Sequence, residues 1–287
     1  MLEKTMKLHN GVEIPVIGLG TWLTPNDIAD EVVKTALQMG YLHIDTAQAY
    51  GNEEGVGQGI RDSGIKREDI FITSKVQAEI KSYKKAKKSI DESLKRLGVD
   101  YIDLMLIHCP QPWVLFRSPF RYFKQNIEVW KALEEAYKEG KLRAIGVSNF
   151  LIDDLENIMN HCEIKPMANQ ILLHIGETPV DVIKFCQEND IVVEAYSPIA
   201  HGKALKNKEI AQMAEKYKVS IPQLCIKYTL QLDTISIPKA SSKEHIEDNM
   251  KLDFEIKEED MIELMKLNRI DYGEDSFWPV FNKKKQG

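Results

Sequence analysis

The sequence predicts an α/β fold, a closed (β/α)8 TIM barrel with an N-terminal β-hairpin that closes the bottom of the barrel. Two observations support this fold class. Short strands and helical patterns alternate along nearly the whole chain, and several strands, such as residues 102–107, are almost continuously apolar. Strands of a parallel sheet that is covered on both faces have this composition. Eight such units within 287 residues fit one barrel, so we expect residues 1–287 to form a single domain.

The composition limits the possible functions. The net charge is -6 and no long basic run occurs, so nucleic acid is not an expected partner. The four cysteines are far apart and form no Cys-x-x-Cys pair, so we expect no metal site and a reducing compartment. Neither a signal peptide nor an apolar run of membrane-spanning length is evident. We therefore expect a cytoplasmic protein without a membrane partner.

The first elements are a β-hairpin, a strand and a helix. A hairpin is predicted over residues 5–16. The Asn10-Gly11 pair predicts a type I′ turn, in which both central residues have positive φ. A short strand follows near Ile17. Apolar residues at helical spacing then predict a helix over 26–39, which Gly40 ends.

The same alternation continues to the end of the predicted barrel. Seven more strands are predicted at 42–45, 70–75, 101–108, 142–147, 167–172, 191–196 and 234–237. Helices are predicted near 53–63, 82–97, 126–139, 152–161, 179–188, 207–217 with 221–231, and 242–250. On this pattern alone, an open doubly wound sheet is the alternative to a closed barrel.

Polar or aromatic residues follow every strand. In a barrel, all eight strand ends surround one mouth, where active sites lie. Taken singly, each residue has a structural explanation, such as a helix cap or a packed ring. Eight of them at one mouth favour a functional site. These residues are Thr21 with Trp22, Asp45, Lys75, His108, Ser148 with Asn149, Asn169 with Gln170, Tyr196 and Lys239.

Three motifs resemble those of the aldo-keto reductase family over essentially the whole chain. The first is GYLHIDTA at 40–47, with Leu42 where the family usually has Arg. The second is LRAIGVSNF at 142–150, and the third is IPKASS at 237–242. Among members of the family, the chain most resembles prokaryotic 2,5-diketo-D-gluconate reductases and aldehyde reductases.

The resemblance implies reduction of aldehydes and ketones with NADPH. Hydride passes to the carbonyl carbon, and Tyr50 is the implied general acid. A nearby ammonium lowers the pKa of a phenol, which is the role implied for Lys75. Asp45 would hold Lys75, and His108 would orient the carbonyl through a hydrogen bond. The expected partner is a small aldehyde, ketone or keto-sugar, and we expect a monomer.

The resemblance also implies a cofactor site. Ser148, Asn149 and Gln170 would bind the nicotinamide carboxamide, and Tyr196 would stack on the ring. The full set is Gly20, Thr21, Asp45, Ser148, Asn149, Gln170, Tyr196, Ser197, Lys239, Ser241, Ser242, His245 and Asn249.

One cofactor residue departs from the family pattern. His245 stands where the family usually has Arg beside the 2′-phosphate of NADPH. Histidine is only partly charged near neutral pH and lacks the fork of Arg. We therefore expect NADPH to be preferred by a reduced margin, with NADH as a weaker alternative. Gly55, Gly57 and Gly59 lack the spacing of a dinucleotide-binding motif, and we assign them no cofactor role.

The substrate pocket is expected to be aromatic. Its predicted walls are Trp22, Tyr50, His108 and Trp113, and other rings occur at 116–123 and at Phe277, Trp278 and Phe281. We expect at least half of those other rings to pack on the barrel instead. Many relatives have Trp where this chain has Cys109, which bears on the size of the substrate.

Two other functions are alternatives to carbonyl reduction. A regulatory or structural NADP(H)-binding protein with slow or no turnover would share the fold and most of the site. An unrelated metal-dependent barrel hydrolase finds no support, because the sequence contains no His-x-His pair or carboxylate cluster.

Overall fold

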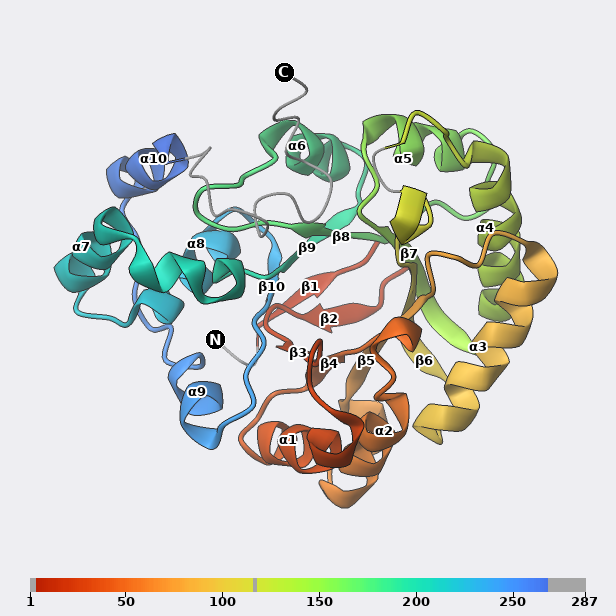
Figure 1. Cartoon of the computed structure of the whole chain (residues 1–287), viewed down its shortest axis with the longest axis horizontal. Helices are drawn as coiled ribbons and strands as arrows, with labels where there is room; N and C mark the ends of the chain where they lie inside the picture. The colour runs from red at the N-terminus through yellow and green to blue at the C-terminus, as the bar shows by residue number, and fades with distance from the viewer. Residues whose placement is uncertain (1–3, 116–117, 268–287) are drawn as a thin grey trace.

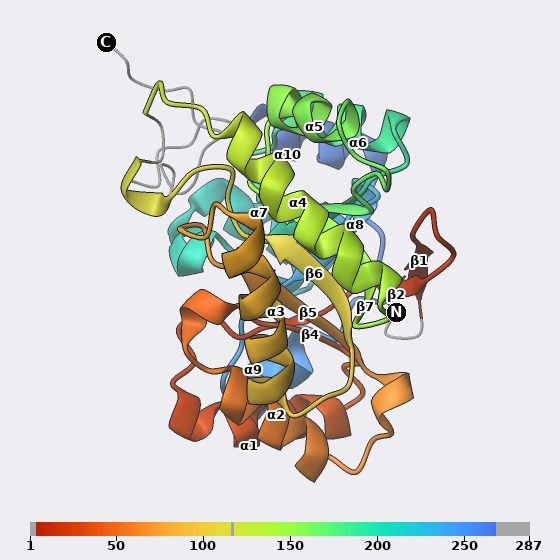
Figure 2. The same cartoon turned by 90° about the vertical axis from the view of Figure 1, so that its right-hand side faces the viewer.

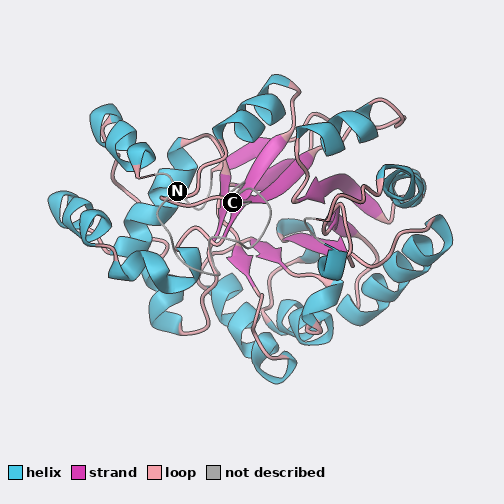
Figure 3. Cartoon of the chain, turned by 45° about the horizontal axis from the view of Figure 1, so that its top comes forward, coloured by secondary structure: helices cyan, strands magenta, loops and turns pink. Residues whose placement is uncertain are grey.

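Eight parallel strands surround a central axis, with helices outside them, in the computed structural model, which describes residues 4–115 and 118–267 (Figures 1 and 3). The strands are β3 (Leu19–Gly20), β4 (His43–Asp45), β5 (Phe71–Val76), β6 (Ile102–Ile107), β7 (Leu142–Ser148), β8 (Ala168–Leu172), β9 (Val192–Tyr196) and β10 (Ile235–Ile237). They pair in sequence order from β3 to β10. Parallel bridges from Ile17 to Ser236 and from Gly20 to Lys239 then join the two outer strands. The prediction of a closed barrel is confirmed, and the doubly wound sheet is excluded.

The strands are buried on both faces, as their apolar sequences require. Every residue of β5 and of β6 is buried. Asp103 is the one charged residue within β6, and it accepts hydrogen bonds from Arg67 at 2.6 Å, from Arg143 at 2.7 Å and from the backbone N–H of Ile72 at 2.9 Å. The carboxylate is therefore tolerated in the strand because its charge and its oxygens are satisfied.

Helices follow the strands in the order that the sequence predicts. They are α1 (Asn26–Gln38), α2 (Glu53–Asp62), α3 (Tyr83–Leu97), α4 (Phe123–Lys138), α5 (Ile152–Met159), α6 (Val180–Glu188), α7 (Lys208–Tyr217), α8 (Ile221–Gln231), α9 (Lys243–Asp248) and α10 (Glu258–Lys266). Short 3₁₀ segments are η1 (Gln48–Tyr50), η2 (Arg67–Asp69), η3 (Trp113–Leu115) and η4 (Ala200–Lys206). Helix α10 was not predicted, because its only local signals are three acidic residues in its first turn and the spacing of Met261 and Leu264.

The hairpin of β1 (Thr5–Lys7) and β2 (Glu13–Pro15) lies at one end of the barrel, as expected (Figure 2). Its turn was predicted wrongly. Only Gly11 has positive φ, and Leu8 bonds to both Gly11 and Val12, which encloses a three-residue loop. Asn10 instead uses its side chain, which donates to the carbonyl of Arg143 at 2.9 Å and thereby fixes the hairpin beside β7.

The glycines of α2 are explained by helix packing. A Cβ added at Gly57 would lie 2.1 Å from the carbonyl oxygen of Leu97 at the end of α3. A Cβ at Gly59 would lie 2.4 Å from the carbonyl oxygen of Asp30 in α1. Helix α2 can therefore approach both neighbours only because it has glycine at these positions.

Candidate active site

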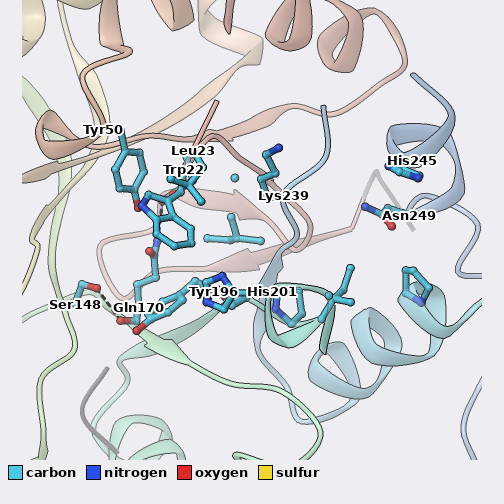
Figure 4. Close-up of a pocket in the computed structure, with 18 of the residues that line it drawn as sticks. Trp22, Leu23, Tyr50, Ser148, Gln170, Tyr196, His201, Lys239, His245 and Asn249 are labelled. Carbon is cyan, nitrogen blue, oxygen red and sulfur yellow. Dashed lines mark hydrogen bonds between the residues drawn. The ribbon is translucent and has the colours of Figure 1, made fainter. Parts of the chain in front are cut away.

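A cavity of about 640 Å³ opens at the carboxyl ends of the strands (Figure 4). Tyr50 and Trp22 lie at one end of it, and His245 and Asn249 lie at the other, with Lys239 between them. Predicted residues that line the cavity are Gly20, Trp22, Asp45, Tyr50, His108, Trp113, Ser148, Asn149, Gln170, Tyr196, Ser197, Lys239, His245 and Asn249. The barrel thus brings most of the predicted site residues to one place.

A buried ion pair lies beneath the end of the cavity that holds Tyr50. Lys75 donates to the two carboxylate oxygens of Asp45 at 2.7 and 2.8 Å and to the carbonyl of Thr46 at 2.9 Å. Burial alone would lower the pKa of Lys75, but the charge of Asp45, together with Tyr50, the hydrogen bond to Asp45 and Glu194, outweighs burial, and the net pKa lies above its ordinary value. The ammonium therefore stays charged although its side chain is only 1% exposed.

Tyr50 ends η1, the short turn that follows β4, and its hydroxyl points to this ion pair. The hydroxyl oxygen lies 3.4 Å from Nζ of Lys75. Burial raises the pKa of Tyr50, and the charge of Lys75 opposes that effect without cancelling it. Lys75 therefore lowers the pKa of the Tyr50 hydroxyl, as expected, but the net pKa of Tyr50 is still above its ordinary value. The phenol consequently carries its proton at neutral pH.

His108 follows β6, and two rings hold it in position. Its ring meets Tyr50 edge-on at a centroid distance of 5.6 Å and Trp113 at 5.2 Å. Burial, with the charges of Lys75 and Lys81, holds the pKa of His108 well below its ordinary value. The imidazole is therefore neutral, and one of its nitrogens can donate a hydrogen bond to a carbonyl oxygen in the cavity.

Gln170 connects the ion pair with the middle of the cavity. Its Nε2 donates to Asp45 at 2.7 Å, while its Oε1 accepts no hydrogen bond from the residues that the structure describes. That oxygen is available to an amide N–H₂ group. The hydroxyl of Ser148 donates to the backbone carbonyl of Gln170 at 2.9 Å.

Asn149 and Tyr196 form the wall next to Gln170. Asn149 has a φ of 62°, and its side chain donates to the carbonyl of His108 at 3.0 Å. Tyr196 donates its hydroxyl proton to Asn149 at 2.7 Å, which fixes the aromatic ring at the cavity. A planar ring system could stack there.

The far end of the cavity is open and is lined by Lys239, His245 and Asp248. Lys239 and His245 are both exposed and line the cavity. Lys239 donates to Ser241 at 3.2 Å, and Ser242 caps α9 by accepting from the backbone N–H of His245. These two serines do not line the cavity. An anion bound at this end would be attracted by the ammonium of Lys239, and the ring of His245 could donate a hydrogen bond to it.

The remaining predicted residues are placed as follows. Thr21 is buried and donates to the backbone carbonyl of Asp45 at 2.9 Å, and Lys75 lies behind the cavity wall. Trp22 and Trp113 do line the cavity, whereas Phe120 is 68% exposed. Four other proposed pocket rings, Phe116, Phe277, Trp278 and Phe281, lie outside the described residues.

Nine further lining residues were not predicted from the sequence: Leu23, Ala49, Pro198, Ile199, His201, Gly202, Leu205, Pro222 and Ile237. Several come from η4, where Ala200 and His201 have positive φ. No sequence signal marks these positions, because non-glycine residues rarely adopt that conformation. The ring of His201 meets Trp22 at a centroid distance of 5.0 Å, so η4 contributes one side of the cavity.

Two further observations concern metal binding and membrane-spanning helices. Within residues 4–115 and 118–267, no three His, Cys, Asp or Glu side chains lie together as a metal ion would require. No helix in the same residues has the length and apolar composition needed to cross a membrane.

Comparison with known proteins agrees with this fold. A model of the aldo/keto reductase family matches residues 16–269. A glyoxal reductase of Bacillus subtilis is 43% identical over 270 residues, which cover 93% of this chain and 94% of the relative. The chain therefore belongs to the aldo/keto reductase family, and it is an oxidoreductase.

Solved structures of the family share the barrel. An aldo-keto reductase from a Medee basin deep-sea metagenome library has a TM-score of 0.86 and 39% identity, covering 92% of this chain and 95% of that one. A Bombyx mori aldo-keto reductase in complex with NADP has a TM-score of 0.84 and 30% identity, covering 97% and 98%.

Proposed function

We propose that this protein reduces small aldehydes and ketones to alcohols with NADPH, and that Tyr50 is the proton donor. The observation that carries the proposal is the contact between the Tyr50 hydroxyl and Lys75, which Asp45 holds charged beneath the cavity. The glyoxal reductase relative supports a small, reactive carbonyl compound as the substrate class.

The four proposed catalytic residues have distinct tasks. Tyr50 gives its proton to the carbonyl oxygen, because burial keeps the phenol protonated at neutral pH. Lys75 stabilises the phenolate that remains, and Asp45 keeps Lys75 in place. Neutral His108 donates a hydrogen bond that holds the carbonyl oxygen near Tyr50.

The residues along the cavity fit a nicotinamide dinucleotide. Gln170 Oε1 and the ring of Tyr196 would hold the nicotinamide end, while Lys239 and His245 would hold phosphate at the other end. When bound, NADPH supplies the hydride. The complex of the Bombyx mori relative with NADP supports this choice, and we propose NADPH over NADH because the exposed ammonium of Lys239 lies at the far end.

The test is turnover of the purified protein with NADPH and a reactive aldehyde such as methylglyoxal, followed at the nicotinamide absorbance band. We expect turnover with NADPH, slower turnover with NADH, and none above background with Tyr50→Phe. Fluorescence quenching by NADPH in the same samples measures cofactor binding separately. Binding without turnover over a panel of aldehydes and ketones would instead support the alternative, a regulatory or structural NADP(H)-binding protein.

A further inference from the structure

A second buried carboxylate lies inside the barrel, beside the ion pair of Asp45 and Lys75. Glu194 is on β9, two residues before Tyr196, so both side chains point to the same side of the strand. Its exposed fraction is 0%, and it lies on the inner side of the barrel with Gln170 and His43. The tasks proposed above for carbonyl reduction do not use this group.

Glu194 and Asp45 share one amide group. Nε2 of Gln170 donates to Asp45 at 2.7 Å and also approaches Oε2 of Glu194 at 3.3 Å. An amide N–H₂ group has two N–H bonds and can donate to both carboxylates, but two carboxylates held this close together repel each other when both are charged. The protonation state of Glu194 therefore affects where Gln170 and Asp45 lie.

No cation balances Glu194 directly. Its Oε1 lies 3.7 Å from Nε2 of His43 and has no hydrogen-bond partner among the described residues. Burial lowers the pKa of His43 to about 3, so this ring is neutral, and its Nε2 pairs with Thr73 at 2.9 Å. The charged groups that face Glu194 are thus Asp45 from β4 and Lys75 from β5, and these two already form a pair.

Burial, reinforced by the charge of Asp45, raises the pKa of Glu194 to about 8, with Lys75 and Gln170 acting in the opposite direction. Below that pH the side chain is mostly a neutral acid. Above it, a second negative charge lies beside Asp45. Such a charge draws the Gln170 amide away from Asp45 and disfavours phenolate on Tyr50.

We propose, building on the function proposed above, that neutral Glu194 is a positioning residue for carbonyl reduction. It supports Gln170, and through Gln170 the pair of Asp45 and Lys75, in the arrangement that proton donation by Tyr50 requires. Ionisation of Glu194 disturbs this arrangement and sets the alkaline limit of the reaction.

The test is the pH dependence of kcat in wild type and in Glu194→Gln, which keeps the shape of the neutral acid and cannot ionise. With a pKa of about 8, the neutral fraction falls about tenfold between pH 7 and pH 9. We expect similar kcat values at pH 7, and a ratio of variant to wild type that rises about five- to tenfold by pH 9. The matched control is Glu53→Gln, since Glu53 is equally buried but bonds to Arg96 and Ser74. The control should keep the wild-type pH profile.

A second measurement does not depend on turnover. Titration of Tyr50 is followed by tyrosinate absorbance, with Tyr50→Phe in each background subtracted. In Glu194→Gln, phenolate should form at a pH lower by about half a unit or more, because Lys75, which acts on both Glu194 and Tyr50, then faces one negative charge fewer. If wild type has no turnover, the proposed function fails while this titration still tests the coupling. An unchanged kcat profile, or an unchanged titration where no turnover exists, would overturn the role of Glu194.

Discussion

The Tyr50→Phe variant tests the contribution of Tyr50 to turnover separately from its contribution to stability. The Tyr50 hydroxyl makes one contact with Lys75, at 3.4 Å, whereas Lys75 keeps three shorter contacts with Asp45 and Thr46. A hydrogen bond typically contributes about 0.5–1.5 kcal/mol to stability, and a long one contributes at the low end. The ring and its packing remain. The free energy of unfolding should therefore change by less than about 1 kcal/mol.

The expected loss of activity is much larger. A positioned general acid contributes about 100- to 10,000-fold in rate, which corresponds to about 3–5 kcal/mol of activation free energy. Phenylalanine has no proton to donate, and no other hydroxyl is described within hydrogen-bond reach of Lys75. Turnover of Tyr50→Phe should accordingly fall at least about 100-fold.

Three measurements on the same preparation test this reasoning: kcat with a reactive aldehyde, NADPH binding by fluorescence quenching, and urea denaturation. We expect loss of the first with the other two nearly unchanged. Turnover above about one tenth of wild type would show that Tyr50 is not the acid. A parallel loss of stability would show that its main role is structural.

Three further variants test other parts of the structure. Lys75→Met leaves Asp45 buried without its partner, and we expect a loss of about 3–5 kcal/mol in urea denaturation together with loss of turnover at neutral pH; unchanged stability would contradict the described pair. Gly57→Ala forces a Cβ against the carbonyl of Leu97, and thermal denaturation should show a loss of about 1–3 kcal/mol, whereas a neutral result would mean that α2 can move. His245→Arg should tighten NADPH binding and leave NADH binding nearly unchanged, as measured by fluorescence quenching; weaker NADPH binding would show that His245 does not face the phosphate.

The architecture could be predicted because short stretches of the sequence indicate each strand and most of the helices. Strands covered on both faces have nearly continuous apolar sequences, and their order around a barrel follows from alternation with helices. The position of Asp45 and Lys75 was foreseeable for the same reason, since residues at the ends of neighbouring strands must lie near each other. The polar contacts of Asp103 and the buried position of Glu194 depend on partners far along the chain, and no local pattern indicates them.

The hairpin turn and helix α10 were not predicted correctly, because both depend on tertiary contacts. The Asn10-Gly11 turn takes a longer form in which the Asn10 side chain bonds to Arg143, more than 100 residues away in the chain. Helix α10 packs Met261 and Leu264 into a small second apolar cluster, and Asp260 pairs with Lys216 of α7. A helix this short owes its stability to such packing rather than to its own sequence.

The direction of the pKa shift of Tyr50 was also not predicted correctly from the sequence. The presence of Lys75 suggested a lowered value, because the sequence shows which charges come together but not how deeply they are enclosed. In the structure, burial is the largest influence on the phenol and acts in the opposite direction. The same reasoning applies to His108, whose neutral state follows from burial that only the assembled barrel provides.

The seam between β3 and β10 joins the first and last units of the barrel. It has two parallel bridges, at Ile17 and Gly20, and β3 itself is only two residues long. Gly20 and Lys239, which form the second bridge, both line the cavity. A dinucleotide lying along that wall would contact both ends of the barrel sheet at once. Occupancy of the cavity would then stabilise the closed ring of strands as a whole, because opening the seam would cost the contacts of the bound ligand as well as the bridges.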